Sequence, residues 1–379
     1  MNRVSATLRS GAMAGAACMV AAMATTPATA SGRAAAAPGW KVVATGLDNP
    51  RQLAFSGNGT LYVVEAGKGG RTPCVPDPED PKARRCFGTS GALTAVTHGP
   101  QRRVLTGLPS LAGPTGASAT GPTDVSFTGR RSYVMSFGLG AMPSVRKALP
   151  PTGQLLGTLA SGRLGFSTPS RFADVAANEA KTNPDGKQVD SNPVAILRQG
   201  SRYLVADAGG NAVVSAARNG SFATVAVFPV AQVLAPPVLK LPPGTKIPMD
   251  AVPTAMARGR QGVLYVSQLT GFPFPVGGAR IWTARAGKKP VAYAGGLTNV
   301  TDLAFGRDGS LYAVQIATHG LLQGPQGSLV KVSRTGGKPI VIAGNLPSPY
   351  GVAVQGGSAY VSTCSVCAGG GQVLRIPLP

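Results

Sequence analysis

Five polar residues of this sequence could together bind a hard cation. Carboxylate and amide oxygens are the ligands that Ca²⁺ prefers in proteins. Three asparagines precede apolar segments and two carboxylates end others: Asn49, Asn192, Asn299, Glu65 and Asp207. A cation among them would activate a water molecule or polarise a carbonyl, with Glu65 or Asp207 as the general base. The alternative is structural, with these side chains capping turns and tying segments together.

Further polar residues stand at two kinds of position along the chain. One kind lies at or just after the start of an apolar segment, and the other kind ends the apolar segment that follows. They add five members to a candidate ligand-binding set: Arg51, Asp124, Gln268, Asp302 and Gln315. A polar side chain is costly to bury unless it is hydrogen-bonded or solvated. The pattern therefore predicts that these residues meet at a wet surface.

Histidine chemistry is scarce in this chain. Only His98 and His319 are present, which argues against a zinc enzyme built on several imidazoles. His319 follows an apolar segment and is the histidine that could act as a base in a quinone-dependent dehydrogenase. The sequence has no Gly-x-Ser-x-Gly elbow of a serine hydrolase. The glycine-rich segment at 207–211 joins two predicted strands, so it is not a phosphate-binding loop.

The strongest pattern in the sequence is a sixfold repeat. Six of the eight tyrosines lie in one apolar, β-branched context: Tyr62, Tyr133, Tyr203, Tyr265, Tyr312 and Tyr360. A second recurring segment begins 10 to 12 residues before each tyrosine, with proline at its start except in the fifth copy, where Val300 replaces it. Turn residues such as Gly57-Asn58-Gly59 separate the two segments. Each pair is therefore predicted to form a β-hairpin, with its tyrosine in the core.

Two further strands are predicted to follow each hairpin. Third strands are expected at 91–97, 153–159, 211–217, 279–284, 327–333 and 371–377, and fourth strands at 102–108, 222–228, 290–297 and 338–346. The sixth copy lacks its own fourth strand, and the similar segment at 41–47 is expected to supply it. This arrangement predicts an all-β six-bladed β-propeller over residues 40–379. Insertions fall at 68–90, 139–190 and 229–248, with a short helix expected at 171–181.

The propeller fold would bring the candidate residues together. In each blade the first strand lines the central channel and the second runs antiparallel to it. The start of the first strand and the end of the second therefore share one face, and the ten residues named above are predicted to surround the mouth of the channel. Phe272 and Phe274 follow one second strand. They would form an aromatic rim at the mouth or, alternatively, anchor the loop as buried side chains.

Residues 1–30 are predicted to be a secretory signal peptide. Arg3 and Arg9 precede an apolar run at 11–24, and Ala28-Thr29-Ala30 matches a cleavage site. The alternative is a lipid anchor at Cys18. Residues 31–39 are expected to be a flexible lead-in, and no later segment is predicted to span a membrane. The protein is therefore expected to be extracellular.

The chain is strongly basic, with a formal net charge of +22. Its lysines and arginines are scattered and form no basic helix, so nucleic acid is not an expected partner. The charge favours solubility or adhesion to anionic cell-envelope polymers.

Four cysteines remain after the predicted leader. An even number in an exported chain predicts disulfides, and the simplest pairing joins Cys74 to Cys86 and Cys364 to Cys367. Four cysteines allow three connectivities. A four-cysteine zinc site and a redox role for the Cys-x-x-Cys motif are the alternatives.

Several segments resemble the bacterial ScyD/ScyE family of secreted proteins. They lie at 172–186, 190–193, 207–211, 226–229, 268–282 and 298–312, and the segment at 203–214 is similar to an NHL-type repeat. The resemblance extends from about Trp40 to Pro379, and QLTGFPFPVG at 268–277 is its most specific part. It implies a secreted six-bladed propeller and carries neither an established reaction nor catalytic residues.

Two classes of function fit these observations. The favoured one is a binding or scaffold protein that presents the polar channel mouth to a small ligand or a protein partner, without catalysis. The alternative is an enzyme at the same mouth: a Ca²⁺-dependent hydrolase, lactonase or isomerase, or a quinone-dependent dehydrogenase. Scarce histidines and few acids favour the first class, and fold analogy is weak evidence for the second.

Overall fold

The computed structural model describes residues 39–379 except 81, 98–99, 167 and 334–337. The predicted signal peptide at 1–30 and all but the last residue of the lead-in at 31–39 lie outside the described residues, as does His98. Within the described part, no helix has both the length and the apolar character needed to cross a membrane.

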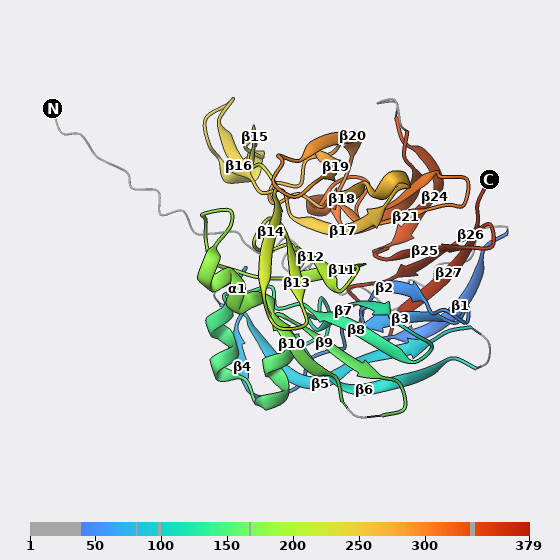
Figure 1. The fold of residues 1–379 in the computed structure, drawn as a ribbon. Helices are drawn as coiled ribbons and strands as arrows, with labels where there is room; N and C mark the ends of the chain where they lie inside the picture. The colour runs from blue at the N-terminus through green and yellow to red at the C-terminus, as the bar shows by residue number, and fades with distance from the viewer. Residues whose placement is uncertain (1–38, 81, 98–99, 167, 334–337) are drawn as a thin grey trace.

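Six antiparallel sheets form the blades of a propeller, and their first strands surround its centre (Figure 1). Blade one contains β2 (Pro50–Phe55), β3 (Leu61–Glu65), β5 (Arg84–Ala95) and β6 (Arg102–Ala112); blade two contains β7 (Pro122–Phe127), β8 (Ser132–Phe137), β9 (Thr158–Arg163) and β10 (Ser170–Asp174); blade three contains β11 (Pro193–Gln199), β12 (Arg202–Asp207), β13 (Ala212–Ala217) and β14 (Phe222–Val227). Blade four contains β17 (Pro253–Arg258), β18 (Leu264–Gln268), β19 (Ala279–Ala284) and β20 (Val291–Leu297); blade five contains β21 (Val300–Phe305), β22 (Leu311–Gln315), β23 (Gln326–Lys331) and β24 (Ile340–Pro347); blade six contains β25 (Val352–Gln355), β26 (Ser358–Thr363) and β27 (Gly371–Pro377).

The N-terminal strand completes blade six, as the sequence pattern predicts. Strand β1 (Lys41–Leu47) pairs antiparallel with β27, so that Lys41 lies opposite Arg375 and Leu47 opposite Gly371. The first and last strands of the chain therefore share one sheet, and the ring of blades is closed.

Hydroxyl groups near the channel join neighbouring blades at four of the six junctions. A threonine at the same place in three first strands donates to a carbonyl of the following blade: Thr123 to Pro193 at 3.0 Å, Thr254 to Val300 at 2.7 Å and Thr301 to Tyr350 at 2.7 Å. Ser362 of blade six donates to the carbonyl of Arg51 in blade one at 2.8 Å. Because all these groups are buried, each bond also satisfies a carbonyl that water does not reach.

The repeated tyrosines pack between neighbouring blades, and four of the six are buried. Tyr62, for example, is buried and lies 4.6 Å from Phe127 of the next blade between ring centroids. Tyr133, Tyr203 and Tyr312 are also buried. Tyr265 and Tyr360 remain partly exposed but also contact the next blade, with ring centroids 5.2 Å from Phe305 and 5.3 Å from Phe55.

The insertion in blade two differs from the sequence expectation. The third strand was expected at 153–159, but β9 begins at Thr158, and a short 3-10 helix, η2 (Pro151–Leu155), occupies the start of that range. Proline lacks an N–H, so Pro151 suits the first turn of a helix better than the ladder of a central strand. The helix expected at 171–181 is also shorter, because residues 170–174 form β10 and helix α1 spans Val175–Thr182.

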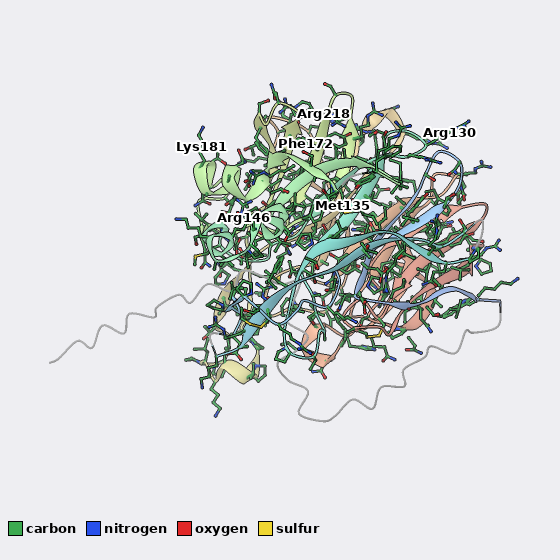
Figure 2. The ribbon with its side chains drawn as sticks, turned by 90° about the horizontal axis from the view of Figure 1, so that it is seen from below. Arg130, Met135, Arg146, Phe172, Lys181 and Arg218 are labelled. Atoms are coloured by element: carbon green, nitrogen blue, oxygen red, sulfur yellow. A yellow bond between two sulfur atoms is a disulfide. The ribbon has the colours of Figure 1, made fainter. Side chains whose placement is uncertain are left out.

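Helix α1 is fixed at its N-terminus by Asp174. The Asp174 carboxylate accepts a hydrogen bond from the Ala177 N–H at 2.9 Å, which caps the helix. The Arg146 guanidinium, from a second 3-10 helix, η1 (Pro143–Ala148), lies 2.9 Å from the same carboxylate. Figure 2 shows Arg146 close to this helical part of the molecule. These contacts fix the insertion to the outer part of blade two.

The proline-rich insertion at 229–248 is a hairpin that projects from the ring (Figure 1). Its strands are β15 (Ala231–Leu234) and β16 (Lys246–Met249), joined through the short 3-10 helix η3 (Pro237–Leu239). Two more 3-10 helices, η4 (Arg260–Gly262) and η5 (Leu321–Gln323), lie in loops of blades four and five.

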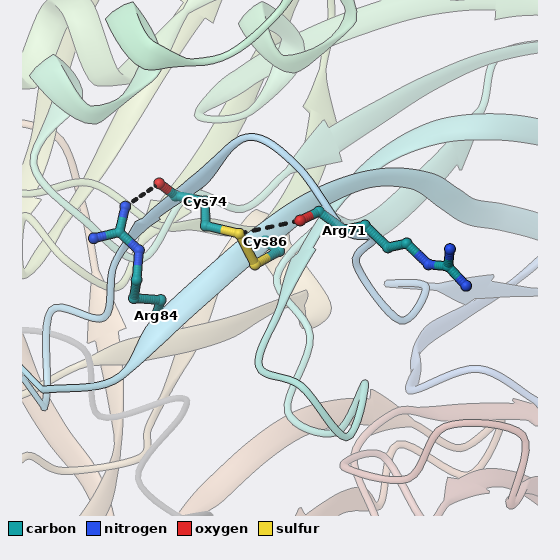
Figure 3. Close-up of a disulfide and its surroundings, with 4 residues drawn as sticks. All are labelled: Arg71, Cys74, Arg84 and Cys86. Atoms are coloured by element: carbon teal, nitrogen blue, oxygen red, sulfur yellow. Dashed lines mark hydrogen bonds between the residues drawn. A yellow bond between two sulfur atoms is a disulfide. The ribbon is translucent and has the colours of Figure 1, made fainter.

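Both expected disulfides are present, Cys74–Cys86 and Cys364–Cys367. The first joins the short strand β4 (Cys74–Pro76) to β5, and Figure 3 shows the Arg84 guanidinium donating to the Cys74 carbonyl beside it. With these four sulfurs paired, the alternative of a four-cysteine zinc site is wrong.

Candidate functional site

Two of the three predicted asparagine ligands hold loops together. Asn49 and Asn299 have left-handed backbone conformations, with φ of 50° and 45°, which asparagine tolerates better than most residues. The Asn49 amide donates to the carbonyls of Gly67 and Gly116 at 2.7 and 2.8 Å. The Asn299 amide donates to Leu269, and its oxygen accepts from the Leu321 N–H. Each side chain therefore connects separate loops of the same face.

Three of the polar residues at the ends of the second strands share a different contact. They accept a hydrogen bond from a backbone N–H at the start of their own blade: Glu65 from Asp48 at 2.8 Å, Asp207 from Asn192 at 2.6 Å and Gln315 from Thr298 at 2.6 Å. Gln268 instead accepts from the Trp282 indole at 3.0 Å. All four side chains are buried, so these bonds explain why a polar residue is retained there.

Glu65 is also the acceptor of a buried ion pair. Its two carboxylate oxygens lie 3.0 and 2.6 Å from two nitrogens of Arg103. Hydrogen bonding to Glu65 raises the pKa of Arg103 above its ordinary value. The carboxylate is fully buried, whereas the Arg103 side chain is 41% exposed. Arg103 thus places a positive charge beside the buried Glu65 carboxylate.

The aromatic residues predicted near the mouth belong to a buried apolar cluster. Phe274 is buried in a cluster with Tyr350 and Leu321, and Phe272 packs against this cluster while staying half-buried. The Arg51 guanidinium stacks 4.8 Å above the Tyr350 ring and donates to the Ala119 carbonyl at 2.6 Å. The structure therefore favours the anchoring role for Phe274 over an aromatic rim.

The third asparagine, Asn192, lies beside the loop that follows β8 of blade two. Its side-chain oxygen would be 2.6 Å from a Cβ added at Gly138, so glycine at that position leaves room for the amide. Within the part of the chain that the structure describes, no three His, Cys, Asp or Glu side chains are arranged to hold a metal ion. His319 is exposed in the loop that leads to η5.

An open cavity of about 280 Å³ lies farther along the channel. Its lining runs from Gln52 to Phe55 in β2 and from Asp124 to Phe127 in β7, and it includes Asp302 of β21. The inner end is polar, and the half-buried Phe55 and Phe127 mark the outer end. The cavity therefore opens on the face where the first strands end, opposite the predicted mouth.

Asp124 and Asp302 occupy equivalent places in this channel. Each accepts one hydrogen bond from the N–H that follows it and one from the next blade: Asp124 from Val125 at 2.7 Å and Ile196 at 2.8 Å, and Asp302 from Leu303 at 2.7 Å and Val352 at 2.6 Å. Gln52 occupies the same place in blade one, and its amide nitrogen can donate to Asp302 at 2.5 Å. Sequence reasoning missed Gln52, although the repeat alignment places it level with both aspartates.

Burial changes the charge state of these two carboxyl groups. Removal from water raises the pKa of Asp124 to about 7, against the hydrogen bonds that lower it. Removal from water also raises the pKa of Asp302 well above its ordinary value, and the Asp124 charge adds to this shift. The inner end of the cavity therefore offers carboxyl oxygens that accept hydrogen bonds and, when protonated, donate them.

A second group of carboxylates lies beside the loop after β12. Asp190 and Glu179 are each 2% exposed, and neither Asp190 oxygen has a hydrogen-bond partner among the described residues. Burial, reinforced by neighbouring acids of which Asp207 acts most strongly, raises the pKa of each to about 8. A Cβ at Gly209 would lie 2.7 Å from the Asp190 carboxylate, and one at Gly210 would lie 2.6 Å from Glu179. The glycines of the 207–211 segment thus make room for these acids.

The fold and the channel cavity define the protein as a six-bladed β-propeller with a polar channel. No family model matches the chain, and no curated protein matches it.

Among solved structures, the chain is similar to a putative oxidoreductase (glucose dehydrogenase) from Thermus thermophilus, with a TM-score of 0.53 and 13% identity over 89% of this chain and 99% of that one. It is also similar to another glucose dehydrogenase, with a TM-score of 0.51 and 14% identity over 90% and 100% of the two chains. A protein of unknown function from Bacteroides thetaiotaomicron gives a TM-score of 0.51 and 9% identity over 89% and 75%. At these identities the similarity concerns the fold.

Proposed function

We propose that the protein is a secreted ligand-binding or scaffold propeller that holds a small polyhydroxylated molecule in the channel cavity. One observation carries this proposal: a cavity of about 280 Å³ has Asp124, Asp302 and Gln52 at its inner end. This volume is near the lower end of the range for ligand pockets, about 300 to 1,000 Å³. A molecule of monosaccharide size matches it.

The lining chemistry supports a hydroxyl-rich ligand. Each oxygen of Asp124 accepts one backbone hydrogen bond and retains a second lone pair for a ligand hydroxyl, whereas the Gln52 amide can donate to the Asp302 carboxylate. Ser126 also lines the cavity, as do residues of β11 and β17 such as Ile196 and Met256. The surface of the cavity is mostly polar, which suits a ligand that offers several hydroxyl groups.

This proposal retains the binding class favoured by the sequence and moves the site to the other end of the channel. The resemblance to the ScyD/ScyE family supports an extracellular role. Of the ten predicted residues, Asp124 and Asp302 belong to the proposed site. The structural hydrogen bonds of Asn49, Glu65, Asp207, Gln268, Asn299 and Gln315 account for their polarity without a ligand.

The proposal is tested by titrating the protein with D-glucose and with myo-inositol in a calorimeter. We expect saturable binding of at least one probe, weakened by about tenfold or more, or about 1.4 kcal/mol, in the Ser126→Leu variant. The larger side chain would occupy the cavity and leave the hydrogen bonds of Asp124 and Asp302 intact. Ser201→Leu, in the exposed turn between β11 and β12, is the matched control and should bind normally. Equal binding by both variants would place the ligand elsewhere.

A further inference from the structure

A groove between blades four and five combines aromatic rings with arginines. Its volume is about 670 Å³, and the turns after β17 and β21 border it. Tyr265, Tyr293 and Phe305 contribute the rings, and Arg258, Arg260 and Arg307 contribute the charges. All three arginines are exposed. The groove lies on the face where the first strands end, which is also the face on which the channel cavity opens.

The charge of the groove is uncompensated. None of its three arginines forms an ion pair with a carboxylate among the described residues. Arg258 donates to the Gly262 carbonyl at 3.1 Å, which leaves its charge unneutralised. Asp308, the acid nearest in sequence to Arg307, instead contacts Ser310 and lies 3.9 Å from Lys331. The groove therefore presents three guanidinium groups to an anionic ligand.

The three rings form the apolar part of the groove, and Tyr293 adds to the tyrosine–phenylalanine contact that other blades also make. Tyr265 belongs to the repeated tyrosines, yet it is partly exposed where four of its equivalents are buried. A Cβ at Gly259 would lie 2.5 Å from the Tyr265 ring, so glycine allows the ring to lie against the backbone. Tyr265 meets Tyr293 at 86° and Phe305 at 77°. In neither pair are the ring planes parallel, so these rings do not form the flat platform on which successive nucleobases stack.

We propose that this groove binds a segment of an acidic polysaccharide, with the arginines on its carboxylate or sulfate groups and the rings against the apolar faces of its sugars. Guanidinium groups bind such anions through paired hydrogen bonds. An open groove suits a chain that continues beyond it, and the net charge of +22 favours encounter with a polyanion. This site is independent of the channel cavity.

The test uses polygalacturonate oligomers and dextran sulfate as probes, with neutral dextran and oligothymidylate for comparison. We expect the triple variant Arg258→Ser/Arg260→Ser/Arg307→Ser to weaken binding of an acidic saccharide by about tenfold or more, and wild-type affinity to fall as salt rises. The matched control, Arg102→Ser/Arg130→Ser/Arg131→Ser, removes the same charge from exposed positions in blades one and two; Figure 2 shows Arg130 at the edge of the molecule. The control should bind nearly as wild type does.

Three outcomes would overturn the proposal. Equal loss in both triple variants would show that total charge decides binding. Equal affinity for neutral dextran would remove the role of the arginines. Tighter, arginine-dependent binding of oligothymidylate would make the groove a nucleic-acid site. The single variant Arg307→Ser repeats the test with one surface change, and Ser126→Leu should bind the acidic saccharide normally whether or not the channel holds a ligand.

Discussion

The Asp190→Asn variant should unfold at a higher temperature than the natural protein at about pH 8.5, whereas the two should unfold together at about pH 4. Asp190 is buried among acids and has a pKa of about 8 in the folded protein, compared with about 3.9 in an unfolded chain. Between these values the folded state holds a proton that the unfolded state has released. Stability therefore falls as pH rises through this window, and it levels off above the folded pKa.

The amide of the variant has no proton to lose. Each unit between the folded and unfolded pKa values corresponds to about 1.4 kcal/mol, so we expect an advantage of a few kcal/mol for Asp190→Asn at high pH. Thermal melts in EDTA, which keeps cations from replacing the proton, would measure it. Glu179→Gln should act in the same direction, since its pKa is also about 8. Asp80→Asn, the same change in the Cys74–Cys86 loop, is the control. A pH-independent difference for Asp190→Asn would show that its carboxyl does not titrate in this window.

Loss of the Arg103 charge should destabilise the protein more than loss of its neighbour Arg102. Arg103 neutralises the fully buried Glu65, and removal of one partner from a buried pair costs about 3 to 5 kcal/mol. Because Arg103 itself is 41% exposed, we expect Arg103→Met to cost about 3 kcal/mol, the lower end of that range. Denaturant unfolding would measure this, with Arg102→Met as the control on the same strand.

A second substitution should recover most of that loss. Glu65→Gln would leave an oxygen to accept the Asp48 N–H, as Gln315 accepts the Thr298 N–H in blade five. The double variant Glu65→Gln/Arg103→Met should therefore be more stable than Arg103→Met alone, and the double-mutant cycle gives the coupling. If Arg103→Met were as stable as Arg102→Met, the structural role assigned to Glu65 would be wrong.

The sequence predicted the propeller well because each blade repeats one local pattern. The spacing from Pro50 to Tyr62 recurs with little change, and it sets a hairpin whose partners are close in sequence. The closing role of residues 41–47 could also be inferred, since this segment resembles the fourth strand of blade five. Blade two was harder to predict, because residues 153–159 have the apolar pattern of a strand. The 3-10 helix that begins at Pro151 includes the first three of them.

The candidate site was harder to predict because polarity has two causes. Asn49 and Glu65 form hydrogen bonds with buried backbone groups, and no sequence pattern distinguishes this structural role from ligand binding. The apolar cluster near the mouth contains Phe274 and Tyr350, which lie far apart in the chain and come together only in the folded ring. Asp124 and Asp302 were found because they break an apolar pattern, but only the structure shows on which face their cavity opens.

The pairing of Lys41 with Arg375 sets the order in which the molecule can be completed. During translation β1 emerges long before β27, so it has no partner while the blades between them are being made. A nascent chain that folds as it grows can form only an open arc, whose two end sheets expose unpaired strand edges. A polypeptide truncated before β27 would remain such an open arc. We expect cellular proteases and chaperones to recognise these edges, so that the intact ring is the form that accumulates.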